Sequence, residues 1–427
     1  MIDQKGISRN DTELMAPVGS FESLMAAIQG GADSVYFGLE NLNMRSRSSV
    51  NFSLGDLREI LDITTRHNVR AYLALNTVMY DEDLPRAREM LDAAAHEGIS
   101  AVILADQALL EYAASRKLEI HLSTQLNISN AESLRFYSRW ADVVVLAREL
   151  SLDQIRNIHF EIRKNGIKGP SGKPVKLELF AHGALCMAIS GKCYLSLHQF
   201  NHSANRGECF QVCRRSYLVT DAETGYQLEI DNQYIMSPKD LCTIDFLDRI
   251  LEAGISVLKI EGRARSPEYV KTVTTCYHEA LKSIAENSYT EEKIQGWKER
   301  LAGVFNRGFW DGYYLRRKMG EWSQRYGSHA TRRKEYIGKV VNYYAKIGVA
   351  EVQMDAGQLA PSDEVLIIGP TTGVIETKIT ELRDENGAIP SAHKGMLIAF
   401  RVPGAVRKSD KVYRWVAASY QKENQEL

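Results

Sequence analysis

The sequence predicts an α/β protein built on a (β/α)₈ TIM-type barrel, with a cysteine-rich insertion after the seventh strand and a small antiparallel β-barrel at the C-terminus. Two observations lead to the main barrel. Eight short apolar runs, rich in Val, Ile and Leu, are separated by stretches with helical periodicity over the first two thirds of the chain. Each run is apolar without strict alternation, as is typical of strands buried on both faces of a parallel sheet.

The eight predicted strands are short and spaced for helices between them. They cover residues 14–18, 34–38, 70–76, 101–106, 119–124, 142–147, 176–183 and 257–262. The stretch before Gly98 carries Leu84, Ala87, Met90 and Leu91 at helical spacing, and the glycine follows as a C-terminal cap. This alternation favours the barrel.

About seventy residues separate the seventh predicted strand from the eighth, far more than a helix and two loops need. We therefore predict an inserted loop over residues 184–235, and long inserted loops are usually functional. After it, Ser237 and Pro238 predict the start of a helix running through IDFLDRILEAG.

Polar or charged residues follow nearly every predicted strand. In a barrel the carboxyl ends of all strands open at one face, where the active site forms. We therefore expect one pocket lined by the residues at these ends, which are Pro17, Gly38, Asn76, Asp106, Gln125, Arg148, Glu149, His182, Glu261 and Arg263. For Asp106 alone, capping of the following helix is the better interpretation.

The sequence divides into three predicted parts. Residues 1–290 form the barrel with its insertion, residues 291–335 a helical and basic connector, and residues 336–427 the small β-barrel domain. Six short strand patterns without helices, separated by turn signals, predict the last part.

Composition excludes some classes of function. The net charge of -1 gives no overall attraction to nucleic acid, so any such binding needs a local patch. No apolar run has the length of a signal peptide core or a membrane span, which predicts a cytoplasmic protein without membrane contact. In that compartment clustered cysteines are more often metal ligands or catalysts than disulfides.

Four cysteines lie within 28 residues of the insertion, at Cys186, Cys193, Cys209 and Cys213. A zinc site fits in part, because only the last two have the close spacing of zinc knuckles. An iron–sulfur cluster fits better, because it takes four thiolates and tolerates irregular spacing. Burial as small hydrophobes explains Cys276, on a helical pattern, but not these four. A fifth candidate ligand is Cys242.

Basic residues and aromatics alternate between Arg316 and Lys339, where eight Lys or Arg stand against two Glu. Basic side chains neutralise phosphates and aromatics stack on bases, which suits RNA contact. A solvated connector between domains has a similar composition. The candidate RNA-binding residues are Arg316, Arg317, Lys318, Arg325, Arg332, Arg333 and Lys334.

Several blocks of the chain resemble one family. ELFAHGALCMAISGKCYLS, beginning at Glu178, is similar to the signature of the collagenase-like peptidase family, peptidase family U32. ELMAPVGSFESLMAAIQGG near the N-terminus, SANRGECFQVCRRSY, SPKDL and KIEGRARSPEYV resemble its other blocks, and the C-terminal strands resemble the translation-factor-like barrel of many members.

The resemblance implies oxygen-independent hydroxylation more than proteolysis, for which neither a G-x-S-x-G elbow nor an HExxH helix is present in the sequence. The chain is most similar to the branch that hydroxylates the wobble uridine of tRNA to 5-hydroxyuridine with prephenate. Other branches act on a ribosomal RNA cytidine or the ubiquinone ring. Alternatives are a collagenase-like peptidase and a non-catalytic RNA-binding accessory protein.

The resemblance also implies roles for individual residues. The four insertion cysteines would hold the iron–sulfur cluster, of the 4Fe-4S type, with Cys242 as the alternate ligand. Arginines would bind the carboxylates of prephenate, because guanidinium groups bind carboxylates in a bidentate manner. The expected substrate-binding residues are Arg45, Asn76, Gln125, Arg148 and Lys259, and the expected catalytic residues are His182, Glu261 and Arg263. A structural role is the alternative for His182, and an ion pair with Arg263 or Lys259 is the alternative for Glu261.

Overall fold

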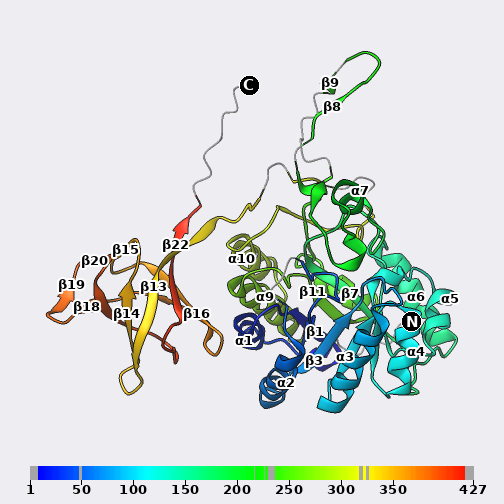
Figure 1. Ribbon diagram of the computed structural model, residues 1–427, viewed down its shortest axis with the longest axis horizontal. Coiled ribbons are helices and arrows are strands. Elements are labelled where there is room, and N and C mark those ends of the chain that lie inside the picture. Colours follow the sequence, from blue (N-terminus) through cyan, green and yellow to red (C-terminus); the bar gives the residue numbers. More distant parts are fainter. Residues whose placement is uncertain are drawn as a thin grey trace.

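The computed structural model describes residues 8–47, 51–215, 217–225, 227–228, 236–316, 321–323 and 327–418. Eight parallel strands close into a ring, because the last of them, β11, pairs with both β1 and β7 (Figure 1). The strands are β1 (Glu13–Pro17), β2 (Ser34–Phe37), β3 (Arg70–Leu75), β4 (Ala101–Leu104), β5 (Ile120–Leu122), β6 (Val143–Val145), β7 (Lys176–Gly183) and β11 (Ile255–Ile260). All eight predicted strands and the barrel are confirmed.

Helices surround this ring, and several begin at the side-chain caps that the sequence offers. Asp106 caps α4, where its Oδ1 accepts a hydrogen bond from the Ala108 amide at 2.9 Å, as predicted. Gly98 ends α3 in the left-handed conformation, with φ of 80°. The helices are α1 (Phe21–Gln29), α2 (Leu57–Arg66), α3 (Leu84–Glu97), α4 (Gln107–Ser115), α5 (Ala131–Tyr137), α6 (Leu152–Lys164), α8 (Leu247–Glu252) and α9 (Pro267–Ala285).

The insertion leaves β7 and returns to the barrel through an additional strand. It contains helix α7 (Leu195–Phe200) and the hairpin strands β8 (Val219–Thr220) and β9 (Gln227–Leu228). Strand β10 (Asp240–Cys242) then pairs antiparallel with β7, and β12 (Phe309–Trp310) pairs with β10. These strands lie outside the closed ring.

The predicted start of a helix at Ser237 is wrong. Helix α8 starts only at Leu247, and the chain before it forms β10. The Ser237 hydroxyl accepts a hydrogen bond from Arg214 Nη1 at 3.0 Å instead of capping a helix. Pairing of β10 with β7 and this contact together outweigh the local capping signal.

Helix α10 (Glu291–Ala302) packs on α9, and the chain then enters an eight-stranded antiparallel sheet. In sheet order its strands are β17 (Gly373–Lys378), β16 (Glu364–Gly369), β22 (Lys411–Ala417), β13 (Arg332–Tyr344), β14 (Val349–Met354), β21 (Leu397–Arg401), β18 (Leu382–Asp384) and β19 (Gly387–Ile389). Strands β15 (Gln358–Leu359) and β20 (Ala392–His393) pair in a separate antiparallel ribbon.

The predicted antiparallel strands of the C-terminal part are confirmed, with two differences. The segment 374–384 forms two strands, because the chain turns at Ile379, whose backbone bonds to Ser362 and Asp363. Among the described residues no ladder joins the edge strands β17 and β19, so the sheet is not a hydrogen-bonded barrel. Ile375 of β17 and Ile389 of β19 pack on the same apolar cluster, so the sheet curls around its own core.

The C-terminal sheet rests on the outer helices of the barrel. The Gln29 side chain on α1 donates to the Thr372 carbonyl at 2.8 Å and accepts from the Val374 amide at 3.0 Å. Lys271 on α9 donates to the Val374 carbonyl at 2.7 Å, and Lys334 on β13 pairs with Glu268 at 2.8 Å. In the described part of the chain, no helix is both long and apolar enough to cross a membrane.

Replacing Gln29 by Ala should weaken the attachment of the C-terminal sheet. The variant leaves two backbone groups of the β16–β17 turn without partners, so we expect a loss of about 1–2 kcal/mol in the free energy of unfolding. Calorimetry of the full chain measures it. Gln295→Ala on the exposed face of α10 is the matched control, and equal effects of the two variants would contradict the prediction.

Candidate active site

A cavity opens at the carboxyl ends of the barrel strands, beneath the insertion. All four insertion cysteines line it, together with most of the polar residues predicted at the strand ends. The predicted residues that it brings together are Arg45, Asn76, Gln125, Arg148, Cys186, Cys193, Cys209, Cys213, Lys259, Glu261 and Arg263. A second chamber beside it shares Arg45, Arg148, Glu261 and three of the cysteines.

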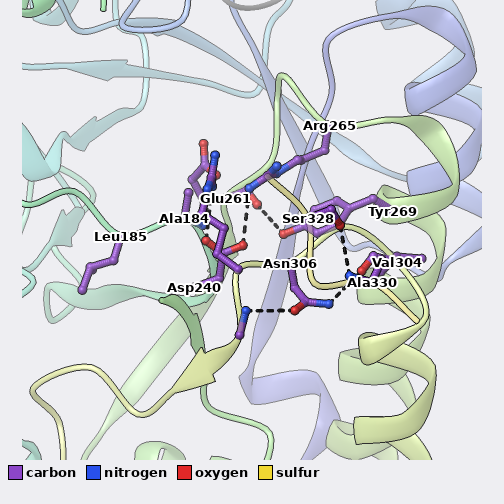
Figure 2. Close-up of polar contacts among 12 residues, drawn as sticks. Ala184, Leu185, Asp240, Glu261, Arg265, Tyr269, Val304, Asn306, Ser328 and Ala330 are labelled. Atoms are coloured by element: carbon purple, nitrogen blue, oxygen red, sulfur yellow. Dashed lines mark hydrogen bonds and ion pairs between the residues drawn. The ribbon is translucent and has the colours of Figure 1, made fainter. Parts of the chain in front are cut away.

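An ion pair crosses the cavity wall between the loop after β2 and the end of β11. Arg45 donates from Nη2 to Glu261 Oε1 at 2.6 Å and from Nε to the same oxygen at 3.1 Å. The other oxygen of Glu261 accepts from the Ala184 amide at 3.3 Å, at the start of the insertion (Figure 2). Glu261 therefore joins strand β11, the β2 loop and the insertion. Its pairing with Arg45 replaces the predicted pairing with Arg263 or Lys259.

The charge state of Glu261 follows from these neighbours. Burial raises the pKa of the carboxyl, but Arg45 and then Arg265 lower it further, and the balance brings the pKa to about 2. In turn the carboxylate raises the pKa of Arg45. Both groups are charged at neutral pH, and the pair is a fixed part of the cavity wall.

Arg148 and Arg263 bring two further positive charges to the cavity with few protein partners. Arg148 lies with Cζ 3.9 Å from the centre of the Phe180 ring and donates from Nη1 to the Ala184 carbonyl at 3.3 Å. Its Nε and the Nη1 of Arg263 are buried nitrogens without hydrogen-bond partners. Burial lowers the pKa of Arg263 to about 10 and also lowers that of Arg148. An anion bound here would satisfy both guanidinium groups.

Gly38 provides the space that Arg263 occupies. A Cβ atom at this position would lie 2.6 Å from Arg263 Nη1 and 2.4 Å from Asn43 Cγ. Any larger residue would displace one of these side chains. The glycine at the end of the second strand is thus explained by close approach to the site.

Amide and hydroxyl groups line the opposite wall. Asn76 Nδ2 donates to Ser123 Oγ at 3.1 Å and to Gln125 Oε1 at 3.2 Å, and the Ser123 hydroxyl also donates to Gln125. The network spans the ends of β3 and β5. Neutral hydrogen-bonding groups of this kind suit a polar ring or a carbonyl-bearing base.

The four cysteines form an all-thiol donor set around one cavity, and none of them is in a disulfide. Burial raises the pKa of Cys193, and raises that of Cys213 to about 11. Among the described residues no three His, Cys, Asp or Glu side chains stand close enough together to hold one metal ion. Four thiols around one cavity are the kind of donor set that an iron–sulfur cluster takes.

Contacts within the insertion and with the barrel hold the insertion in place. The Cys193 amide donates to Asn205 Oδ1 at 3.0 Å, and Arg206 pairs with Asp83 at the start of α3. Arg214 donates to the carbonyls of Leu185 and Pro238 at 2.5 and 2.7 Å. The last pair of contacts joins the beginning of the insertion to its end.

The remaining two cysteines lie elsewhere. Cys242 is buried in β10 and does not line the cavity, and burial raises its pKa to about 12. Cys276 is fully buried in α9, where its thiol faces the Trp297 carbonyl. The position of Cys242 gives no support to its predicted role as alternate ligand.

His182 also lies apart from the cavity. Its ring packs against Tyr269, Tyr277 and Phe309, and burial lowers its pKa to about 3. The cause is a register shift, in which Lys259 faces Phe180 but the next residue, Ile260, already faces His182. An extra residue in β7 turns the ring away from the barrel interior. This placement fits the structural alternative rather than acid–base catalysis.

The structure adds residues that the sequence reasoning did not select. Tyr36 lines the main cavity, and the second chamber contains Arg265 and Arg307. Arg265 lies 3.4 Å from the carboxylate of Asp240, which is buried in β10 (Figure 2). Arg307 also lies 3.4 Å from this carboxylate. Arg265 stands two residues after Arg263, and this spacing in the sequence could have identified it as a cavity residue. No local pattern distinguishes Arg307.

The candidate RNA-binding residues are spread over two regions. Arg316 is exposed and pairs with Asp153, and Arg333 is exposed on β13 beside Glu335. Arg332 lies over the Trp415 ring, and Lys334 pairs with Glu268 of the barrel. The last two therefore hold structure together. Three candidates, Arg317, Lys318 and Arg325, lie outside the described residues.

The model of peptidase family U32 matches residues 19–324, which is more than half of the chain and includes the barrel, the insertion and the cysteines. The chain belongs to this family.

Relatives with different names share this similarity. A protein of Porphyromonas gingivalis named collagenase is 58% identical over 95% of this chain and 98% of its own length. The tRNA hydroxylation protein P1 of Bacillus subtilis is 30% identical, with 91% and 90% covered. A 23S rRNA 5-hydroxycytidine synthase of Escherichia coli is 35% identical over 66% of this chain and 41% of its own length.

Replacing Glu261 by Gln should destabilise the protein in a pH-dependent way. The folded pKa lies below the ordinary value, so the stabilisation is complete above about pH 4.5 and is lost as the pH falls toward 2. At neutral pH we expect a loss of roughly 2–3 kcal/mol, shrinking toward pH 3.

Urea unfolding at a series of pH values measures this difference. Glu132→Gln on the exposed face of α5 is the control, and surface changes of this kind stay within about 0.5 kcal/mol. A difference between wild type and Glu261→Gln that does not vary with pH would contradict the assignment of a charged carboxylate.

Proposed function

We propose that this protein hydroxylates an RNA base without using oxygen, and that its substrate is the wobble uridine of tRNA, converted to 5-hydroxyuridine. We further propose an iron–sulfur cluster, of the 4Fe-4S type, as cofactor and prephenate as co-substrate. The observation that carries the proposal is the meeting of four thiols and several cationic side chains around one cavity. The names of the Bacillus subtilis and Escherichia coli relatives supply the reaction class.

Cys186, Cys193, Cys209 and Cys213 would hold the cluster, which supplies electron-transfer chemistry when bound. The residues fit the group because all four donors are thiols and face the same cavity. Arg45 also lines this cavity, but its charge is paired with Glu261, so it does not compete with the cluster for the four thiolates.

Arg148 and Arg263 would bind the carboxylates of the co-substrate. Arg263 is buried and Arg148 is half-buried, and each has a buried nitrogen without a protein partner. A buried cation without a counter-charge is costly, so a dianionic ligand would relieve two such costs at once. Lys259 adds a third cationic side chain to the same lining.

The collagenase name of the Porphyromonas gingivalis relative supports a second candidate, a peptidase. Most peptidases of the Ser or Cys type use a histidine beside the nucleophile as general base. Among the described residues that line the main cavity, there is no histidine. The chemistry of the cavity therefore favours hydroxylation over hydrolysis.

Serine substitution of the insertion cysteines should separate cluster ligands from other cysteines. Protein purified anaerobically should be brown, with broad absorbance and about four irons per chain. Each of Cys186→Ser, Cys193→Ser, Cys209→Ser and Cys213→Ser should lose most of the iron. Cys242→Ser and Cys276→Ser are the controls and should keep it. Stoichiometric zinc in a colourless wild-type protein would refute the cluster.

Deletion of the gene tests the reaction. Mass spectrometry of tRNA nucleosides from the deletion strain should show loss of wobble 5-hydroxyuridine, and a plasmid copy should restore it. Arg148→Lys and Arg263→Lys should restore it poorly, because an ammonium group cannot make the bidentate contact.

The other outcomes identify the alternatives. Loss of a ribosomal RNA hydroxycytidine would identify ribosomal RNA as the substrate, and loss of ubiquinone would identify the quinone ring. Salt-dependent tRNA binding with no change in any nucleoside would indicate an accessory RNA-binding protein. Gelatin cleavage by pure protein, lost on substitution of a cavity residue, would establish the peptidase.

A further inference from the structure

The interior of the barrel carries a row of charged side chains in addition to apolar ones. Barrel interiors are usually filled by layers of aliphatic side chains. Here an apolar cluster that includes Met15, Ile103 and Val143 occupies part of the interior. Beside it lie Lys259, Glu178 and His121, all three buried.

These three side chains form a continuous hydrogen-bonded chain. Lys259 Nζ lies 2.8 Å from Glu178 Oε1, and Glu178 Oε2 lies 2.9 Å from His121 Nδ1. They come from β11, β7 and β5. At one end of the chain, Lys259 lines the cavity beneath the cysteines.

The other end reaches toward solvent at the amino ends of the strands. His121 Nε2 has no hydrogen-bond partner and lies 3.5 Å from Glu119 Oε1, a distance that a small rotation of either side chain would close. Glu119 is about one third exposed, with 34% of its side chain accessible, and pairs with Arg70 at 2.8 Å. The chain thus connects the cavity to the opposite face of the barrel.

Stability alone gives a weak reason for this arrangement. A buried ion pair often contributes no more than apolar residues of the same volume, because both charges lose their hydration. The Lys259–Glu178 pair would be satisfied without a third titratable group. Histidine can serve as a proton shuttle, and this buried imidazole lies between two carboxylates that could exchange protons with it.

The surrounding charges favour proton uptake by the imidazole. The groups that face His121 are Glu119, Glu178, Tyr72, whose ring centre lies 4.7 Å away, and Glu13, which accepts from the Tyr72 hydroxyl at 2.7 Å. Burial lowers the pKa of His121, but the carboxylates raise it further, so the net shift is upward. Burial likewise lowers the pKa of Lys259.

We propose that Lys259, Glu178, His121 and Glu119 form a proton path through the barrel axis, from the solvent at its amino end to the cavity. Lys259 gives a proton from Nζ to a group in the cavity. The imidazolium of His121 passes its Nδ1 proton to Glu178 Oε2, and rotation of the Glu178 carboxyl group presents that proton to the neutral Nζ. The imidazole, left neutral with its proton on Nε2, turns in its site and takes a new proton on the free ring nitrogen from Glu119. Water restores the proton on Glu119, so one proton crosses and no electrons move.

In this scheme Glu178 and His121 are positioning residues that act through Lys259. The path depends on the proposed function in one respect, because the reaction that consumes the proton is the proposed hydroxylation. General acid–base assistance contributes about 10²-fold or more. His121→Asn and Glu178→Gln should therefore lower kcat for tRNA modification by about 100-fold with little change in KM, and flatten its pH dependence.

Tyr72→Phe is the matched control, because this side chain touches His121 but lies outside the path. It should keep the wild-type kcat and pH profile. An equal loss in all three variants would assign the row to structure alone and overturn the path, as would wild-type kinetics in His121→Asn.

Nuclear magnetic resonance of the full chain with ¹⁵N-labelled histidine gives a readout that needs no activity. The His121 signal is assigned by its response to Glu119→Gln, a partly exposed position that should not affect folding. We expect an imidazolium with both nitrogens protonated near neutral pH, losing a proton as the pH rises. A neutral ring with one fixed tautomer from pH 6 to 9 would refute the path even if tRNA modification is confirmed. If wild-type protein modifies no tRNA, this measurement still decides the path.

Discussion

The candidate site depends on how Arg214 joins the two ends of the insertion. Its guanidinium group contacts the carbonyl of Leu185, where the insertion begins, and that of Pro238, where it ends. Cys186 and Cys213 are the chain neighbours of two of these residues. One planar side chain with several donors therefore sets the separation of thiols that are far apart in the sequence. Lysine, with a single point of charge, could not make the same contacts.

The charge of the cavity follows from the same construction. Glu261 is committed to Arg45 and the Ala184 amide, and Glu178 is committed to Lys259 and His121. Because the acidic groups have protein partners, Arg148 and Arg263 keep donors for a ligand. The cavity is thus arranged for anions on one wall and for a polar ring on the amide wall.

Much of the fold could be predicted from the sequence, because each of the eight buried strands is a short apolar run. The residues facing the cavity also followed from strand ends, as for Asn76, Gln125 and Arg148. Long-range effects could not be read in this way. The register shift that turns His182 outward depends on the pairing of β7 with β11, and Arg307 reaches Asp240 only through the pairing of β12 with β10.

Closure of the barrel by β11 against β7 leaves the insertion outside the hydrogen-bonded ring. Because the free-energy cost of a longer loop grows only slowly with its length, segments between the cysteines and β10 are free to vary among descendants of this fold. The four cysteines and the cationic side chains of the cavity would stay constant while the surrounding loop segments change. Such a division allows one cavity to be presented to ligands of different shape, without change in the barrel core.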